Sequence, residues 1–433
     1  MTELIKTNKY QTPITEELLS SYPDEVREQF MDAISTVPFI QNLISPSRPA
    51  IETLPRDSQG RAIIDITNPP TFEDADWFRQ PALFFLKNGC YTFLRPNSNP
   101  NSEYRKYWDR ELDRCYNGLL RETDGMYIPG YLYWFLNYCP MMINKYKEGQ
   151  KKAIRTEGFA YFFEGIWWRY LYLKNARDKG HHAVELAKRG CAKSYGLAAI
   201  MSHNLIIGES EESKKRTITV LTAYQKEYLK DDKDGTLSKF VPILSFLSKN
   251  TPFPRLMLKQ SSNEMTWQMG YKDEYGRNQG SLNQVMGVSA KDDSDKLRGK
   301  RGYILFEEFG NFPSLLDLYD VTRKSVEDGD YTFALMYLIG TANNKEANFQ
   351  SAKTLLYATE SYNIESLKNV YDKKGQGRDT FGFFFPSYIN RAGCYNKDGI
   401  SDVVKALLQV LMNRYKAKYG ADPTSVLRVI AED

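Results

Sequence analysis

The sequence lacks the residue clusters that disulfide-stabilised and zinc-binding proteins need. Its five cysteines are widely spaced, no two of them form a CxxC pair, and there are only three histidines. An odd, scattered set of cysteines argues against a disulfide framework, and the histidines are too few to complete a zinc site. The cysteines are Cys90, Cys115, Cys139, Cys191 and Cys394. We therefore expect a protein of a reducing compartment.

Long apolar runs and a strong net charge are absent as well. No run approaches the roughly 18 apolar residues of a membrane span, and the N-terminus has no apolar signal segment. The net charge is only +4, so any DNA contact must come from a local patch. Hydrophobic residues make up 42% and charged residues 26%, which predicts a soluble globular protein with a sizeable core and no membrane contact.

The composition divides the chain into three parts. Residues 1–125 are expected to form an irregular, proline-rich N-terminal arm followed by a helical extension, with a helical rhythm over 103–120. Residues 126–400 are expected to form the core of the protein. Residues 401–433 are expected to be a helical C-terminal end.

Aromatic residues are plentiful and concentrated in two blocks. The blocks lie at 127–139 and 159–173, and the second has the clearer helical pattern. We expect both to be core rather than a ligand platform. The segment 401–419 has the pattern of an amphipathic helix that Ser401 caps and Gly420 ends.

Five short apolar runs alternate with helical patterns in the second half of the chain. Buried parallel strands are typically continuous apolar runs of this kind. The alternation predicts an α/β fold with a mainly parallel sheet flanked by helices. We expect strands at 183–186, 217–221, 285–288, 303–306 and 335–339, and a helix that ends near Ile206.

A small-residue loop follows the first of these runs and leads into Lys193, Ser194 and a helix. A triphosphate needs this arrangement, because loop and helix N–H groups surround its oxygens while a lysine neutralises charge and a serine ligates Mg²⁺. The loop departs from GxxxxGK[ST], since alanine replaces both glycines and disfavours positive φ. A solvated lysine at a helix start is the alternative. The candidate nucleotide-binding residues are Ala187, Lys188, Arg189, Gly190, Cys191, Ala192, Lys193 and Ser194.

Two adjacent carboxylates, Glu307 and Glu308, end the apolar run at 303–306. In a P-loop ATPase the first acid at this position helps hold Mg²⁺, and the second polarises the water that attacks the γ-phosphate. Glutamate at the first position departs from the usual aspartate. A strand that simply ends in a charged turn is the alternative. Both motifs in this order favour an ATPase that uses ATP and Mg²⁺, with Ser194 and Glu307 as metal ligands.

A third element ends the last apolar run with Gly340, Thr341 and Ala342. A hydroxyl among small residues at a strand end is how many translocases sense the γ-phosphate. An ordinary strand-to-loop turn explains the same residues.

With these three motifs in place, the sequence resembles the large terminases of tailed phages, particularly those of crAss-like phages, over about residues 125–433. The terminase loop carries an arginine, as Lys188-Arg189 does here, and a Leu-Arg-Gly precedes the acidic strand, as Leu297-Arg298-Gly299 does. The resemblance implies a P-loop NTPase fold of the RecA/ASCE-like type.

The resemblance also implies roles for single residues. Glu308 would be the catalytic base, and Arg189 would be an arginine finger in cis or else a salt bridge that stabilises the loop. The glycine, threonine and alanine of the third element would form the coupling motif. Arg298, Lys300 and Arg301 would contact DNA or a neighbouring subunit, or else form a solvated turn.

As partners the resemblance implies double-stranded DNA, the portal protein, the small terminase subunit and a homo-pentamer in the motor, with the isolated chain monomeric. The place of action would be the cytoplasm of an infected bacterium, outside the mature virion. Terminases continue into a nuclease domain with clustered acids. No such set follows here, so we expect no nuclease activity, through truncation at the domain junction or as a natural ATPase-only subunit.

Two other functions fit parts of the sequence. A helicase-like translocase would need a second RecA-like domain, for which the roughly 90 residues after Asn344 are too few. A non-hydrolysing structural or DNA-binding component would explain the alanines of the loop, but not the retention of Lys193, Ser194 and both glutamates. Recognition of the adenine base is expected near Arg155 or Tyr161, without a glutamine-centred motif.

Overall fold

The computed structural model describes residues 3–145, 154–208, 216–231, 235–291, 293–341 and 346–419. Its centre is an eight-stranded sheet in the order β20-β7-β17-β14-β8-β13-β10-β9. Neighbouring strands from β20 to β13 are parallel, and β10 and β9 are antiparallel. The strands are β7 (Ala183–Ala187), β8 (Ile218–Ala223), β9 (Met257–Ser261), β10 (Thr266–Met269), β13 (Gln284–Ser289), β14 (Tyr303–Glu307), β17 (Met336–Gly340) and β20 (Phe383–Phe385). The predicted mainly parallel α/β sheet is confirmed.

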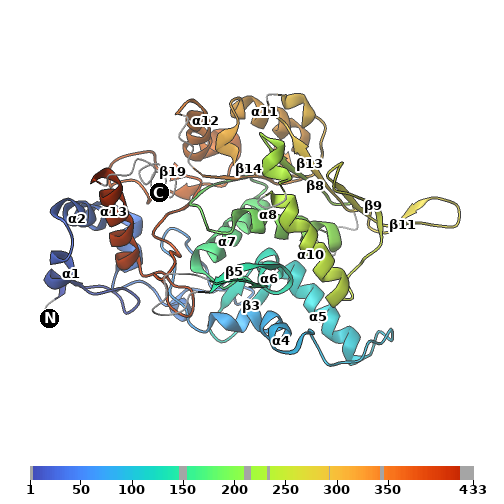
Figure 1. Ribbon diagram of the computed structural model, residues 1–433, viewed down its shortest axis with the longest axis horizontal. Helices are drawn as coiled ribbons and strands as arrows, with labels where there is room; N and C mark the ends of the chain where they lie inside the picture. Colours follow the sequence, from blue (N-terminus) through green and yellow to red (C-terminus); the bar gives the residue numbers. More distant parts are fainter. Residues whose placement is uncertain are drawn as a thin grey trace.

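Helices cover both faces of the sheet (Figure 1). Two lie on the upper face in that view, α11 (Leu315–Val326) and α12 (Glu346–Tyr357). Three lie on the lower face, α7 (Glu164–Lys179), α8 (Lys193–Ile206) and α10 (Thr236–Asn250). A second helical layer lies below these, formed by α4 (Gln80–Asn88), α5 (Glu103–Asn117) and α6 (Gly130–Tyr138).

The two faces of the sheet belong to two separate hydrophobic clusters. In β14, Tyr303 and Leu305 belong to the cluster with α7, α8 and α10, whereas Ile304 and Phe306 belong to the cluster with α11 and α12. Successive side chains of a strand point to opposite faces. Because both faces are covered, every position of the strand is buried, which explains the continuous apolar runs in the sequence.

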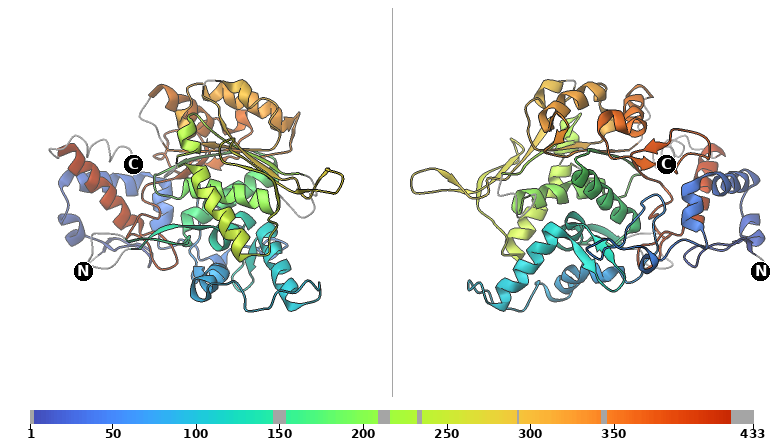
Figure 2. Two further views of the ribbon diagram at one scale, coloured as in Figure 1. Left: turned by 45° about the vertical axis from the view of Figure 1, so that its right-hand side comes forward. Right: turned by 180° about the vertical axis from the view of Figure 1, so that it is seen from behind.

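Short antiparallel pairs surround the central sheet. One pair, β11 (Tyr271–Lys272) and β12 (Asn278–Gln279), forms a ribbon that projects beyond the β9 edge in Figure 1 and Figure 2. The others are β1 (Glu3–Ile5) with β2 (Ile14–Thr15), β3 (Leu119–Arg121) with β4 (Met126–Ile128), β5 (Pro140–Lys145) with β6 (Ile154–Phe159), β15 (Glu327–Asp328) with β16 (Tyr331–Thr332), and β18 (Leu367–Lys368) with β19 (Thr380–Phe381).

The two aromatic blocks are core, as predicted. Block 127–139 forms the end of β4 and all of α6, and block 159–173 contributes most of α7. Trp134, Trp167 and Trp168 are among the largest fully buried side chains. Among the described residues, no helix combines the length and the apolar surface needed to span a bilayer.

The expectation of an irregular N-terminal arm needs correction, because this part contains α1 (Glu16–Ser20), α2 (Asp24–Thr36) and α3 (Pro38–Ile44) in addition to α4. Its prolines do not break these helices. Pro23 is the N-cap of α2, and Pro38 and Pro81 lie in the first turns of α3 and α4, where the missing N–H has no intrahelical partner to lose. The division into 1–125, 126–400 and 401–433 stays a prediction.

The C-terminal helix α13 (Val403–Tyr419) is present, but Ser401 does not cap it. The carboxylate of Asp402 accepts a hydrogen bond from the backbone N–H of Lys405 at 3.1 Å, which is the bond a cap makes. The Ser401 hydroxyl instead accepts from the backbone N–H of Asn390 at 2.8 Å. The predicted end at Gly420 lies outside the described residues.

The arm wraps back onto the rest of the chain, where α2 lies beside α13 in both views of Figure 2. Arg48 and Glu164 form an ion pair at 2.6 Å, and both side chains are fully buried. The other oxygen of Glu164 accepts from the backbone N–H of Ser401 at 2.7 Å. One carboxylate therefore holds together the arm, the start of α7 and the segment before α13.

We predict that Glu164→Gln destabilises the protein by about 3–5 kcal/mol, because it leaves the buried Arg48 without a counter-charge. Urea unfolding would measure the loss of stability, and trypsin should cleave the arm of the variant faster than that of the unaltered chain. The control is Glu103→Gln, which breaks the exposed pair with Lys106 and should change stability by less than about 1 kcal/mol. Equal stability of the two variants would contradict this role of Glu164.

Candidate functional site

The loop between β7 and α8 contains two residues with positive φ, a conformation that alanine disfavours. Gly190 has φ +76° and Ala192 has φ +59°. A left-handed conformation costs a residue with a Cβ roughly 1–2 kcal/mol, so the surrounding structure must hold Ala192 in place. Ala192 is the N-cap of α8, and Lys193 and Ser194 are its first two residues. The loop therefore ends at a helix N-terminus, as the sequence predicts.

A buried arginine of α7 holds this loop from below. Arg169 donates to both carboxylate oxygens of Glu185 in β7, with a shortest distance of 2.6 Å, and to the backbone carbonyl of Cys191 at 2.9 Å. The hydroxyl of Tyr337 in β17 donates to the same carboxylate at 2.5 Å. Sequence reasoning missed this network, although Glu185 is a charged residue within an apolar run and a buried charge requires a partner.

Glu307 is the last residue of β14 and is buried between two helix starts. Its Oε1 accepts a hydrogen bond from the Ser194 hydroxyl of α8 at 2.6 Å, and its Oε2 accepts one from the Thr236 hydroxyl of α10. In the alternation of β14 it shares the face of Tyr303 and Leu305, which is the face of α8 and α10. Burial raises the pKa of the Glu307 carboxyl, and the two hydroxyl hydrogen bonds act in the opposite direction.

Glu308 leaves the strand in a left-handed conformation, with φ +49°. Its Oε2 accepts hydrogen bonds from the backbone N–H and the hydroxyl of Thr341, at 3.0 and 2.9 Å. Gly340 permits this approach, because a Cβ there would lie 3.0 Å from the backbone nitrogen of Phe309. This left-handed conformation interrupts the alternation of side chains along β14. The side chains of both Glu307 and Glu308 therefore lie at the same edge of the sheet.

Lys193 lies between the loop and the acids. Its Nζ donates to the backbone carbonyl of Lys188 at 3.1 Å and lies 3.8 Å from Oε1 of Glu308. Lys188 itself lies over the ring of Phe385 at the end of β20, and burial lowers the pKa of its amine to about 8. The two lysines of the loop therefore have different surroundings, one beside the acids and one beside an aromatic ring.

The residues predicted for phosphate and metal meet at the carboxyl edge of neighbouring parallel strands. Lys193 and Thr341 contact Glu308, and Ser194 contacts the adjacent Glu307, whereas Ala342 lies outside the described residues. Serine hydroxyl and carboxylate oxygens suit Mg²⁺, which keeps several waters and binds substrate phosphates. No group of three or more His, Cys, Asp or Glu that could hold a metal occurs in the described part of the chain.

The structure does not bring every predicted residue to this edge. Arg189 is exposed and forms no ion pair with the described part of the chain. Arg298 is paired with Asp295 at 3.4 Å, with both side chains at least 70% exposed. The N–H of Gly299 donates to the hydroxyl of Ser325 at the end of α11. Arg298, Lys300 and Arg301 precede β14, so they lie at the edge opposite Lys193.

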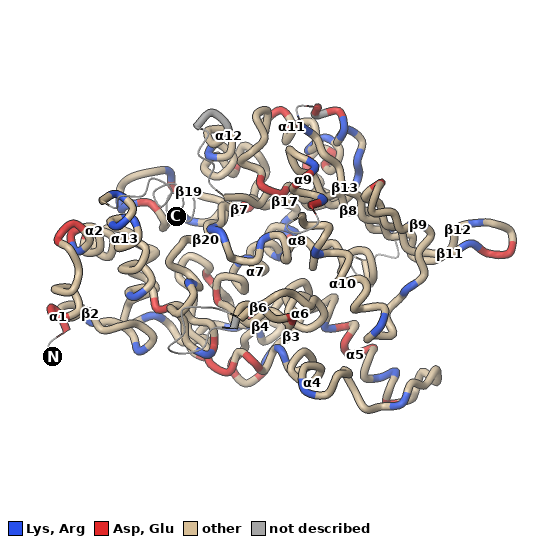
Figure 3. The backbone as a smooth tube through the Cα atoms, viewed as in Figure 1, with Lys and Arg blue, Asp and Glu red and all other residues tan. Residues whose placement is uncertain are grey.

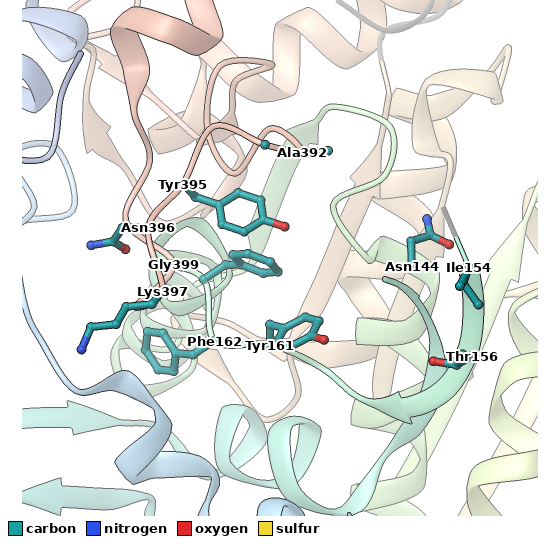
Figure 4. Close-up of a pocket in the computed structure, with 12 residues that line it drawn as sticks. Asn144, Ile154, Thr156, Tyr161, Phe162, Ala392, Tyr395, Asn396, Lys397 and Gly399 are labelled. Carbon is teal, nitrogen blue, oxygen red and sulfur yellow. The ribbon is translucent and has the colours of Figure 1, made fainter. Parts of the chain in front are cut away.

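Two neighbouring cavities open beside the loop, on the β20 side. One has about 690 Å³ and is lined by the loop itself, from Lys188 to Ala192, and by Arg391. The other has about 840 Å³ and shares with it Asn144, Tyr161, Phe163, Ala392 and Tyr395. Figure 4 shows Tyr161 and Tyr395 of this second cavity facing Asn144 and Thr156 of the β5–β6 pair. Of the two residues expected near the base, Tyr161 lines both cavities and Arg155 lines neither.

Comparison with known proteins found no matching family model and no matching curated protein. Among solved structures, the chain is similar to a mutant ATPase domain of the Thermus phage P74-26 large terminase, with a TM-score of 0.38, 13% identity and coverage of 59% of this chain and 89% of that one. It is also similar to the large terminase of bacteriophage HK97, with a TM-score of 0.39, 13% identity and coverage of 70% of this chain. The aligned part spans 54% of the HK97 protein's length. Both of these structures are of phage large terminases. The likeness to this chain is one of fold alone.

Proposed function

We propose that the chain is a Mg²⁺-dependent ATPase of the P-loop type. The observation that carries the proposal is the contact set at the sheet edge, in which Ser194 and Glu307 are 2.6 Å apart and Lys193 lies 3.8 Å from Glu308. A phosphate-binding lysine, a metal-binding hydroxyl and two acids are what hydrolysis of a nucleoside triphosphate needs in one place. They come from sequence positions more than a hundred residues apart, so their meeting is a property of the fold.

In this proposal each residue acts through the side-chain atoms that lie at the carboxyl edge of the parallel strands. Lys193 moves its ammonium from the Lys188 carbonyl to the phosphate oxygens, and the N–H groups at the start of α8 bind the same oxygens. Ser194 and Glu307 would hold Mg²⁺, which would supply positive charge beside the phosphates. Glu308 accepts the proton of the attacking water as general base. Its contact with Thr341 connects that base to the predicted coupling residues, and Arg189 is the candidate arginine finger.

In this proposal the base and the ribose bind in the cavities on the β20 side. In the sheet, β14 lies on one side of β7 and β20 on the other. The γ-phosphate would lie toward Glu307 and Glu308 at the end of β14, and the base and ribose toward β20. On that side lie the exposed ring of Tyr161 and the ring of Tyr395 (Figure 4). We propose that the base stacks on Tyr161.

The biological role that we propose is translocation of double-stranded DNA into a procapsid, as the motor of a phage terminase. Its support is the terminase-like sequence of the loop and of residues 297–299. Charges of both signs are interspersed over the chain (Figure 3), so a DNA contact needs a local patch, for which Arg298, Lys300 and Arg301 are the candidates. The portal, the small terminase subunit and a pentameric arrangement are the proposed partners, in the cytoplasm of an infected bacterium.

We predict Mg²⁺-dependent ATP hydrolysis at high protein concentration. Glu308→Gln should lower the rate at least about 100-fold while it keeps nucleotide binding, because the amide cannot take a proton. Lys193→Ala should weaken nucleotide binding itself. Turnover and binding of a fluorescent ATP analogue would measure both effects. If no nucleotide binds to the unaltered chain or to either variant, the ATPase proposal is wrong and a non-hydrolysing component becomes the better reading.

Tyr161→Ala should weaken ATP binding by about 1–3 kcal/mol, roughly 5- to 150-fold, because a stacking surface for the base is lost. Binding of inorganic tripolyphosphate, which has no base, should stay unchanged. The control is Tyr331→Ala, since Tyr331 is 82% exposed in the β15–β16 pair and lines neither cavity. Equal affinity of both variants for ATP would place the base elsewhere.

The triple variant Arg298→Gln, Lys300→Gln, Arg301→Gln should bind duplex DNA more weakly at low salt. It should also reduce the slope of log affinity against log salt by up to about 3, at roughly 0.9 per lost phosphate contact. The matched control is Arg105→Gln, Lys106→Gln, Arg110→Gln on α5, which removes the same charge from an exposed face. An identical loss in both triples would mean that net charge alone acts.

A further inference from the structure

Thr236 is a residue of the site that no sequence motif singled out. It is the first residue of α10, its side chain is fully buried, and its hydroxyl donates to Oε2 of Glu307. The partner lies 71 positions further along the chain. The opposite oxygen of the same carboxylate accepts from Ser194. Two hydroxyls from the first turns of two helices therefore fix both oxygens of one acid.

The hydroxyl of Thr236 is not occupied by the usual task of threonine at a helix start. Threonine caps a helix from the N-cap position, where its hydroxyl accepts from a backbone N–H, and Thr236 lies one residue beyond that position. In α10 the N-cap is Gly235, which has no side chain to cap the helix. The helix also packs against α8, and the ammonium of Lys239 lies 5.7 Å from the centre of the Tyr195 ring. The hydroxyl is thus free for Glu307, and the helix that carries it is held in place.

The contact fixes the direction in which Glu307 offers its other oxygen. A carboxylate can rotate about its terminal bond, and a hydrogen bond to one oxygen removes that freedom. With Oε2 held by Thr236, Oε1 is directed to Ser194, where the two ligands of the proposed ion meet. Without the hydroxyl, Oε2 would be a buried acceptor without that partner. The carboxylate would then rotate toward another donor, and Oε1 would no longer be directed to Ser194.

We propose that Thr236 is a positioning residue for the metal-binding carboxylate, acting through its hydroxyl on Glu307. This inference rests on the proposed ATPase function and goes beyond it, because it assigns part of the metal affinity to α10. Residues that orient a metal ligand in this way typically contribute 10- to 100-fold to metal affinity. The effect should therefore appear in the metal dependence of nucleotide binding and not in binding without metal.

The test compares ADP binding in Mg²⁺ and in EDTA, using a fluorescent ADP analogue, for the full chain and its variants. Thr236→Val, which has the same shape without the hydroxyl, should reduce the Mg²⁺-dependent gain in affinity 10- to 100-fold and leave the affinity in EDTA unchanged. Thr236→Ser, which restores the hydroxyl, should stay within about 3-fold of the unaltered chain. The Mg²⁺ concentration for half-maximal ATP hydrolysis should rise in the valine variant alone.

Thr322→Val is the matched control, because among the described residues its buried hydroxyl donates to the Leu318 carbonyl within α11 alone. Thr236→Ala gives the same comparison if the valine variant is unstable. Equal Mg²⁺-dependent gains in Thr236→Val and Thr322→Val would overturn the inference, as would an equal loss in Thr236→Val and Thr236→Ser. Both results leave the ATPase proposal standing, whereas failure of the unaltered chain to bind nucleotide would overturn that proposal first.

Discussion

The buried ion pair between Arg169 and Glu185 decides where the loop after β7 stands. Its cost is high, because two charges have left water, and it is compensated by a network that includes the hydroxyl of Tyr337 and the carbonyl of Cys191. The pair joins α7 to β7 and β17 and reaches the loop from inside the core. Since the loop is anchored in this way, Ala192 can be held in a left-handed conformation that its side chain disfavours. The start of α8, and with it Lys193 and Ser194, follows from that position.

The second constraint is the way in which β14 ends. A strand directs adjacent side chains to opposite faces, which would separate Glu307 from Glu308. The left-handed turn at Glu308 overcomes this, and the absence of a side chain at Gly340 makes room for the turn. Glu307 then remains on the face of α8 and α10, while Glu308 reaches the end of β17. The two acids differ in surroundings, one enclosed by hydroxyls and the other shared between a lysine and a threonine, and this difference suits two different roles.

The sequence predicted the five central strands because each contains a short apolar run, and in β14 and β17 every position is buried. It did not predict β20 at one side of the sheet, or β10 and β9 at the other. β20 has only three residues, β10 alternates buried with half-buried residues, and β9 has no buried residue. The helices of the arm were missed because its many prolines were read as breaks, although Pro23, Pro38 and Pro81 stand at helix starts. At the site, the loop and the acids carry recognisable motifs. Arg169 and Thr236 carry none, because their roles arise from contacts across the fold that no local pattern records.

The attachment of the arm to the far end of the chain determines when the protein can finish folding. The side chain of Gln11 bonds to the backbone of Ser401 and Val403, and β20 completes the parallel sheet beside β7 only after residue 385. At roughly 5–20 residues per second, a ribosome needs about 20–80 s to pass from Gln11 to Ser401. During that time the apolar faces of α2 and α3 have no final partner. A nascent chain of this design therefore depends on cellular chaperones more than one whose contacts are local.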